Sequence, residues 1–195
     1  MMTTNTFQGE RPVFLREQAN KMYGVLPYFI AKILAELPVF IIVPLIFNAI
    51  TYFSIGYNRI VEQFFMFQAA YTLNTLCAIS FGYLISSAIK NQAMALALAP
   101  IVAMPLLLVG GFYSNQETAP IYIEVFSYIS PLQYVFNMIA KLQFTNSENQ
   151  KGKELAEFLD ITRPYEEGLL YLCIEVVVFL FVAFILLKTM IDRFQ

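Results

Sequence analysis

The stretch YFIAKILAELPVFIIVPLIFNAITYF, residues 28–53, decides the fold of this chain. It carries only two charged side chains, Lys32 and Glu36, and both lie near its beginning. A helix of about twenty residues crosses the ~30 Å hydrocarbon layer of a membrane, because each residue adds about 1.5 Å. The stretch therefore predicts a transmembrane helix.

Three further apolar runs, at residues 64–89, 93–112 and 169–187, are also long enough to span a membrane. Hydrophobic residues make up 58% of the chain and charged residues 13%, against about 25% charged in ordinary soluble domains. The composition predicts an all-α polytopic membrane bundle with four transmembrane helices and excludes a soluble enzyme. A net charge of −2 with scattered basic residues leaves no surface for nucleic acid.

The distribution of Lys and Arg predicts the orientation of the spans, because cytoplasmic flanks carry an excess of these residues. With both termini in the cytoplasm, including a short tail at 191–195, only Arg59 would lie in the short loop on the opposite side. The long segment 113–168 would then face outward. The basic residues on the cytoplasmic side would be Arg11, Arg16, Lys21, Lys32, Lys90, Lys188 and Arg193.

The outward segment contains an apolar stretch, residues 121–144, that is interrupted at Ser130-Pro131. Each half is too short to span, so we expect a re-entrant hairpin of two short helices whose broken backbone is covered by protein. The polar stretch that follows it places Leu155, Phe158 and Leu159 at helical spacing, which predicts a short amphipathic helix before the last span.

Before the first span, residues 1–9 are expected to be disordered and residues 10–27 to form an amphipathic helix. Its apolar face would hold Leu15, Ala19, Met22 and Leu26, which recur every three or four residues. Such a helix lies in the headgroup layer or docks on a cytoplasmic partner, and the pattern alone favours the headgroup layer.

Carboxylates inside spans are costly and therefore mark candidate functional positions. Lys32 precedes Glu36 by one helical turn, which predicts either a local ion pair or a polar relay toward a cytoplasmic partner. Glu175 lies in the last span, and no partner for it can be named from the sequence. The chain contains no histidine, and no catalytic or metal-binding constellation is expected.

Two polar or small-residue faces are predicted on the second span. Ala78, Gly82 and Ser86 lie four residues apart, as close contacts between membrane helices require. A second face, able to form hydrogen bonds with neighbouring helices, consists of Gln68, Thr72 and Thr75. Both faces are interpreted as packing devices.

Three sequence stretches resemble the G subfamily of ABC transporters, the half-transporters of the White pigment-carrier and multidrug-resistance type. The first is ERPVFLREQANKMYGVLPYFIAKILAELP, residues 10–38, which resembles the link between that family's second and third spans. The second is GGFYSNQETAPIYIEVFSYISPLQYVFNMIAKLQF, residues 110–144, which is similar to the end of its fifth span and its re-entrant outer hairpin. GKELAEFLDI, residues 152–161, looks like its outer helix before the sixth span.

The resemblance implies that residues 28–190 form a type-2 ABC transmembrane domain and that the amphipathic helix is a coupling helix packed against a nucleotide-binding domain. Residues that match the coupling motif, and would transmit the movement of that domain, are Glu10, Arg11, Phe14, Arg16 and Glu17.

The resemblance also implies a substrate cavity and an outer gate. The positions aligned with the cavity-facing side of the fifth span are Pro100, Met104 and Leu107. Drug exporters of the family have paired leucines after the glycine, whereas this chain has Phe112 and Tyr113 after Gly111. The gate would therefore be aromatic.

The implied activity is ATP-driven export of lipid-like or amphipathic substrates by alternating access in a homodimer or heterodimer of halves. The chain carries no G-x-x-x-x-G-K-[ST] motif, so ATP and Mg²⁺ would bind to a nucleotide-binding domain supplied elsewhere, and no cofactor to this chain itself. It would then be a C-terminal part of a half-transporter or need the missing parts in trans. An alternative is a non-transporting membrane subunit that regulates or caps a full-length half-transporter. The plasma membrane and an internal membrane are both compatible.

Overall fold

The computed structural model describes residues 2–20, 22–57, 60–89, 91–110, 127–145 and 164–192, and all the regular structure in these ranges is helical. The elements are α1 (Met2–Ala19), α2 (Val25–Ile55), α3 (Val61–Ala88), α4 (Gln92–Leu108), α6 (Pro131–Ala140), the π-helical turn η2 (Lys141–Thr145) and α8 (Tyr165–Asp192). The predicted all-helical class is confirmed for the described residues.

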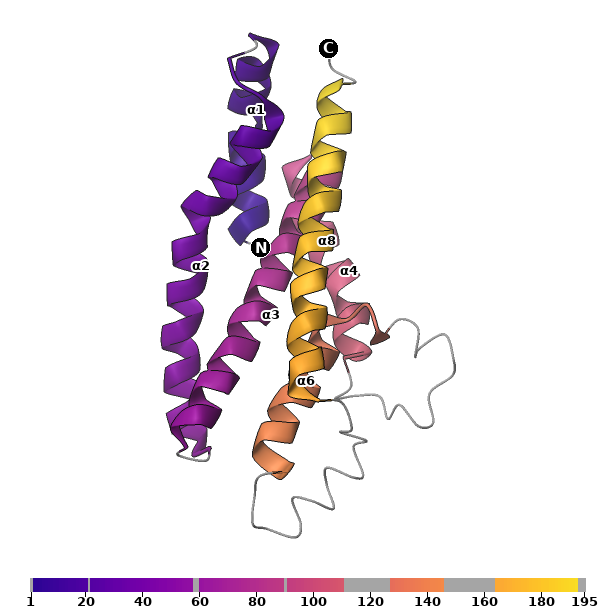
Figure 1. The fold of residues 1–195 in the computed structure, drawn as a ribbon. Helices are drawn as coiled ribbons and strands as arrows, with labels where there is room; N and C mark the ends of the chain where they lie inside the picture. The colour runs from indigo at the N-terminus through magenta and orange to yellow at the C-terminus, as the bar shows by residue number, and fades with distance from the viewer. Residues whose placement is uncertain are drawn as a thin grey trace.

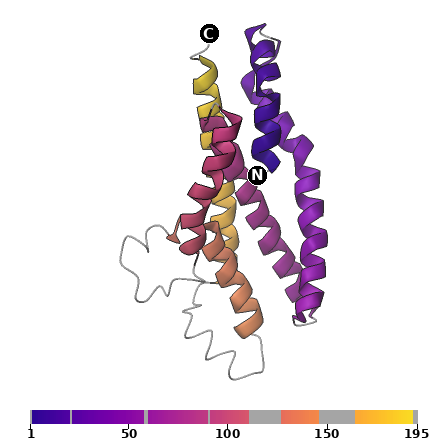
Figure 2. The same ribbon diagram turned by 180° about the vertical axis from the view of Figure 1, so that it is seen from behind.

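The helices form one elongated bundle with α3 at its centre (Figures 1 and 2). α3 packs along α8, its most extensive neighbour, and also contacts α1, α2, α4 and α6. α1 runs beside the first part of α2, and the chain's C-terminus lies at the same end of the bundle as the α1–α2 turn (Figure 1). We call this end the junction end.

Within the described residues, three helices are long and apolar enough to cross a membrane: Val25–Ile55, Val61–Ala88 and Tyr165–Ile191. Three of the four predicted spans are therefore supported, each a few residues longer than predicted at one or both ends. α4 has 17 residues, which corresponds to only about 26 Å. The fourth complete span stays a prediction.

α6 begins where α4 ends and continues toward the end of the bundle that holds the α2–α3 turn (Figures 1 and 2). The Ser130 hydroxyl donates a hydrogen bond to the Leu106 carbonyl (2.7 Å), and Pro131 stands in the first turn of α6, where its missing N–H costs nothing. The predicted interruption at Ser130-Pro131 is thus present. The first part of the expected hairpin, the candidate gate Phe112 and Tyr113, and the polar stretch 146–163 lie outside the described residues.

The expected boundaries of the first helix were wrong. α1 begins at Met2, so the predicted disorder of residues 1–9 does not hold for residues 2–9, and α1 ends at Ala19 rather than continuing to residue 27. The early start follows from tertiary packing, because Phe7 is buried edge-on against Tyr83 of α3 with their ring centroids 5.7 Å apart. The end follows from the extended conformation of Gly24, which caps the beginning of α2.

The expected apolar face of that helix was wrong for Met22 and Leu26, whereas the side chains of Leu15 and Ala19 lie outside those that the structure describes. Met22 is 68% exposed and Leu26 is 51% exposed, since both lie after the end of α1. The buried side of α1 instead carries Phe7, Phe14 and Gln18, separated by seven and four residues. These spacings also place residues on one helical face.

The two faces predicted on α3 make only some of the expected contacts with neighbouring helices. Ala78 is exposed, Gly82 is half-buried and Ser86 is buried, so the small residues do not form one continuous contact. The Thr75 hydroxyl donates to the Tyr71 carbonyl of its own helix (2.9 Å) rather than to a neighbouring helix.

The end of α2 opposite the junction end is fixed by aromatic packing. Tyr52 is fully buried, with its ring centroid 5.2 Å from that of Phe64 and 5.0 Å from that of Phe67, both on α3. Gly56 ends α2 in a left-handed conformation (φ 78°), which glycine adopts without strain, and its N–H donates to the Tyr52 carbonyl. We call Tyr52, Tyr57, Phe64 and Phe67 the aromatic cluster.

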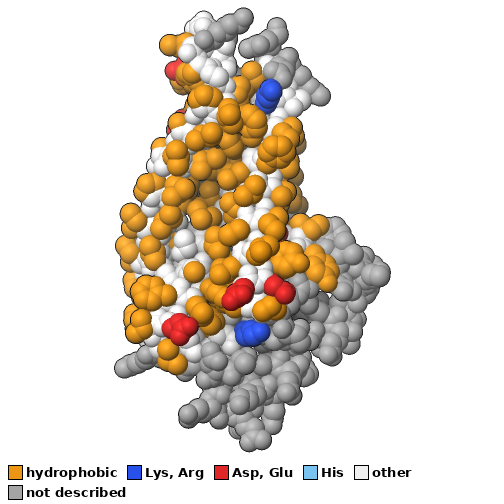
Figure 3. All heavy atoms as spheres, viewed as in Figure 1, with side chains coloured by type: hydrophobic (Ala, Val, Ile, Leu, Met, Phe, Trp, Pro, Cys, Tyr) orange, Lys and Arg blue, Asp and Glu red, His pale blue; other side chains and the backbone are white. Residues whose placement is uncertain are grey.

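Large apolar side chains cover much of the molecular surface (Figure 3). They lie on α2, α4 and α8 and include Phe47, Phe53, Met104, Val177 and Phe181. Continuous apolar surface of this extent requires lipid or another protein against it. α2 also contains Pro38 and Pro44, and Figure 1 shows that it changes direction along its length.

Close approach of α6 to α4 predicts a cost for enlarging Gly110. A Cβ atom at this position would lie 2.9 Å from Leu132 Cβ, an atom that cannot move without its backbone. We expect Gly110→Ala to lower stability by about 1–3 kcal/mol, measured as a lower apparent melting temperature in detergent.

The matched control is Gly9→Ala, because an added Cβ on Gly9 meets nothing within 4 Å. This change should be neutral or slightly stabilising, since alanine favours helix. Equal melting temperatures for the two variants would contradict the close packing of α4 on α6.

Candidate functional site

A lysine between two carboxylates marks the place where α1 meets α2. The Lys32 ammonium lies 2.6 Å from Glu10 Oε2 of α1 and 2.9 Å from Glu36 Oε1, one turn further along α2. The Lys32 side chain is only 10% exposed, and that of Glu36 17%. The structure therefore contains the local ion pair that the spacing predicts, and adds Glu10, which no local pattern indicated.

Glu36 also receives hydrogen bonds from two other helices. The Tyr83 hydroxyl of α3 donates to Glu36 Oε2 (2.5 Å), and the Thr6 hydroxyl of α1 donates to Glu36 Oε1 (3.3 Å). Hydrogen bonds to a charged acceptor offset part of the cost of removing it from water. We call Thr6, Glu10, Lys32, Glu36 and Tyr83 the junction cluster, and it joins α1, α2 and α3.

Aromatic rings close the turn between α1 and α2. The Phe14 ring stacks on the Tyr28 ring with centroids 4.0 Å apart, and the Tyr23 ring is also stacked with Tyr28, with centroids 5.9 Å apart. The Gln18 amide donates to the Tyr23 carbonyl (2.9 Å), and the Tyr23 hydroxyl donates to Glu17. Burial, followed by this bond to Glu17, raises the pKa of Tyr23 above its usual range, so its hydroxyl keeps the proton that it donates.

The residues that match the coupling motif thus have different positions. Glu10 and Glu17 are held by partners within the chain and Phe14 is buried, whereas Arg16 is exposed. The side chain of Arg11 lies outside the described residues. Sequence reasoning missed Thr6, Phe7 and Tyr83; only the seven-residue spacing of Phe7 and Phe14 could have indicated the buried face of α1.

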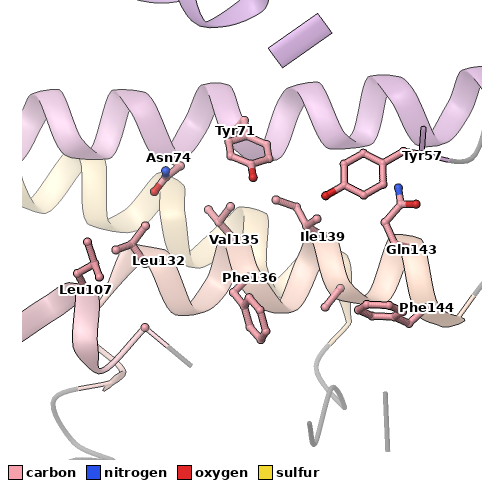
Figure 4. Close-up of a pocket in the computed structure, with 12 residues that line it drawn as sticks. Tyr57, Tyr71, Asn74, Leu107, Leu132, Val135, Phe136, Ile139, Gln143 and Phe144 are labelled. Atoms are coloured by element: carbon pink, nitrogen blue, oxygen red, sulfur yellow. The ribbon is translucent and has the colours of Figure 1, made fainter. Parts of the chain in front are cut away.

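The three candidate cavity residues on α4 are not brought together in one pocket. Pro100 is half-buried, and Met104 is 66% exposed on the outside of the chain. Leu107 lines a pocket between α3 and α6 (Figure 4). Their role in substrate binding stays a prediction.

The structure supplies a partner for Glu175. The Cys77 thiol of α3 donates to Glu175 Oε2 at 3.6 Å, while Oε1 is buried without a hydrogen-bond partner among the described residues. This contact joins α3 to α8. Within the same residues, no group of three or more potential metal ligands occurs.

Long apolar helices around a central helix, with an additional helix fastened at one end, define a multi-pass α-helical membrane protein. Residues 1–144 match the family model described as ABC-2 type transporter, and the chain belongs to this family. Its relatives include members of the ABC transporter G family.

Three relatives illustrate the similarity. The chain is 45% identical over 132 residues to "Protein white" of Drosophila melanogaster, covering 68% of this chain and 19% of that protein. It is 33% identical over 131 residues to "ABC transporter ATP-binding protein/permease wht-1" of Caenorhabditis elegans (67% and 20%). It is 29% identical over 143 residues to "ABC transporter G family member 21" of Arabidopsis thaliana (73% and 21%). The chain therefore spans about one fifth of the length of these relatives.

Removing the Lys32 charge should destabilise the junction end, because it leaves two carboxylates without their cation. We expect Lys32→Met to cost about 2–3 kcal/mol, less than a fully buried pair because Glu10 is half-exposed. The measurement is the apparent melting temperature of the purified chain.

Lys188→Met is the matched control, since Lys188 is exposed near the same end of the bundle. Adding Glu36→Gln to Lys32→Met removes one uncompensated charge and should recover part of the loss. A melting temperature unchanged by Lys32→Met, or lowered equally by Lys188→Met, would show that the cluster does not stabilise the junction.

Proposed function

We propose that this chain is the membrane-spanning part of an ATP-driven exporter of lipid-like or amphipathic molecules. Membership of the ABC-2 type family and the G family relatives support transport across a membrane. The observation that carries the proposal is the junction cluster, because it fastens a partly exposed helix outside the spans to α2 and α3.

In the proposed mechanism, a nucleotide-binding domain that holds ATP and Mg²⁺ presses on the exposed side of α1, where Arg16 lies. The Phe14–Tyr28 stack and the Glu10–Lys32 ion pair make α1 and the beginning of α2 move together. The hydrogen bond from Tyr83 to Glu36 then passes this movement to α3. Lys32 and Glu36 act in this way as the polar relay.

A second half, identical or different, would pack against the apolar surface of this one. Under this proposal Pro100, Met104 and Leu107 of α4 contribute to a cavity for a lipophilic substrate between the halves. The exposure of Met104 supports this, because a flexible thioether at such a surface adapts to varied apolar ligands. Phe112 and Tyr113 would form the outer gate, and lipids would cover the remaining apolar surface.

The proposed orientation places the junction end in the cytoplasm. Arg16 and Lys188 lie at the ends of α1 and α8 that meet there, whereas Glu62, Glu166 and Glu167 begin α3 and α8 at the opposite end. An excess of basic residues at the junction end is typical of the cytoplasmic side.

Charge reversal at Arg16 tests coupling. In the complete transporter that contains this domain, Arg16→Glu should lower the rate of ATP hydrolysis about fivefold or more, in the usual range of coupling energies between sites. The melting temperature should stay unchanged, because Arg16 is exposed. The measurement is phosphate release by the purified transporter in nanodiscs.

Lys188→Glu provides the control, as an equal charge change at the same end of the bundle. Hydrolysis at the unmodified rate in Arg16→Glu, or an equal loss in Lys188→Glu, would contradict docking of the nucleotide-binding domain at α1.

The orientation can be tested separately with single cysteines. Met22 lies exposed in the α1–α2 turn, and Ile60 lies exposed next to the α2–α3 turn. In a Cys173→Ala background, a membrane-impermeant maleimide added to intact cells should label Ile60→Cys and not Met22→Cys. Permeabilised cells should show labelling of both, and the reverse pattern in intact cells would place the junction end outside.

A further inference from the structure

A pocket of about 470 Å³ lies between α3, the end of α4, α6 and η2. Its volume is within the range of about 300–1,000 Å³ that is typical of sites for small organic molecules. Apolar side chains of α6, including Val135 and Ile139, form one wall, and Tyr71 of α3 points into the pocket from the other (Figure 4). One chain supplies all of these residues.

The pocket has polar groups at both ends. Asn74 lies near Leu107 at one end, and Tyr57 and Gln143 approach each other at the other (Figure 4). Gln143 Nε2 is buried close to the Tyr52 hydroxyl, which can accept one of its two amide hydrogens, and the other hydrogen has no acceptor among the described residues. A buried amide donor without an acceptor costs about 1–3 kcal/mol, so it offers a bond to an acceptor on a ligand.

The π-helical turn η2 explains why this donor reaches the pocket. η2 directly follows α6 and carries both Gln143 and Phe144, which line the pocket. A π-helical turn widens the helix and changes the direction of its side chains, and such turns are frequent at functional sites. The local structure therefore places a donor and an aromatic ring on the pocket wall.

The described lining residues favour uncharged ligands. No Lys, Arg, Asp or Glu occurs among the described residues that line the pocket. An ion placed there would lose its hydration without a counter-charge, which costs far more than the available hydrogen bonds return.

We propose that this pocket is a small-molecule site within a single chain, which binds an uncharged, mainly apolar molecule through a hydrogen-bond acceptor facing Gln143. It is separate from the cavity proposed between two halves, because Pro100 and Met104 do not line it and only Leu107 is shared. Binding here needs neither a second half nor ATP.

Benzophenone is a suitable probe, since it is uncharged and combines two aromatic rings with one carbonyl acceptor. On irradiation its carbonyl abstracts a hydrogen from a nearby C–H and a carbon–carbon bond forms at that site, so labelled peptides report its position. We expect saturable labelling of peptides from α3 or from residues 131–145 in membranes containing the chain, without ATP. Labelling of the exposed α8 residues Val177, Val178 and Phe181 serves as the reference for partitioning into lipid.

Two variants test the site in different ways. Ala140→Leu fills the pocket and should reduce its labelling several-fold, whereas Ala69→Leu makes the same change on the exposed side of α3 and should have no effect. Gln143→Leu keeps the side-chain volume and removes the donor, so the concentration for half-saturation should rise roughly fivefold.

If Ala140→Leu lowers the melting temperature, Gln143→Leu decides the question. Labelling that does not saturate, or that is unchanged in Gln143→Leu, means nonspecific partitioning only and overturns the proposal. Failure of the Arg16→Glu test would leave this result untouched, because the labelling requires no ATP hydrolysis.

Discussion

The ion pairs of one largely buried lysine determine how α1, α2 and α3 are placed relative to one another at the junction end. A cation such as Lys32 at the beginning of a membrane span is costly unless carboxylates lie beside it. Glu10 comes from α1, Glu36 from α2, and the hydroxyl that supports Glu36 from α3. Because all three helices must bring a group to the same point, their relative positions near this end are restricted far more than apolar contacts would restrict them.

Elsewhere in the bundle, the relative positions of the helices are determined by close backbone approach at glycines and by isolated polar contacts. Helices in a membrane gain little from hiding apolar side chains, since lipid tails are equally apolar. α6 therefore packs closely where Gly110 and Gly168 have no side chain. A Cβ at these two positions would collide with Leu132 and Met138 of α6. The Tyr165 hydroxyl bonded to the Met66 carbonyl (2.6 Å), and the Cys77 thiol bonded to Glu175, align α8 along α3.

The sequence predicted those features that depend on residues close together in the chain. Hydropathy located α2, α3 and α8, and the four-residue spacing placed Lys32 beside Glu36. Tyr83 could not be predicted as a partner of Glu36, because the two residues are 47 positions apart and meet only through packing. The predicted start of α1 failed for the same reason: residues 2–9 are polar enough to suggest disorder, but tertiary contacts such as that of Phe7 with Tyr83 hold them against the bundle. The pocket beside η2 had no signal either, since Gln143 acquires its position from a π-helical turn.

Pro38 and Pro44 give α2 uneven stiffness. Each proline lacks an N–H, so the carbonyls of Leu34 and Phe40 lose their helical donors and bending there breaks no hydrogen bond. The junction cluster fixes the beginning of α2, before the prolines, and the aromatic cluster fixes its end, after them. α2 is therefore held by contacts at both ends and can bend at the prolines between them. A force applied to α1 would change the angle between the two parts of α2 that meet at the prolines. The end at the aromatic cluster can then keep its packing on α3 while the end at the junction cluster tilts.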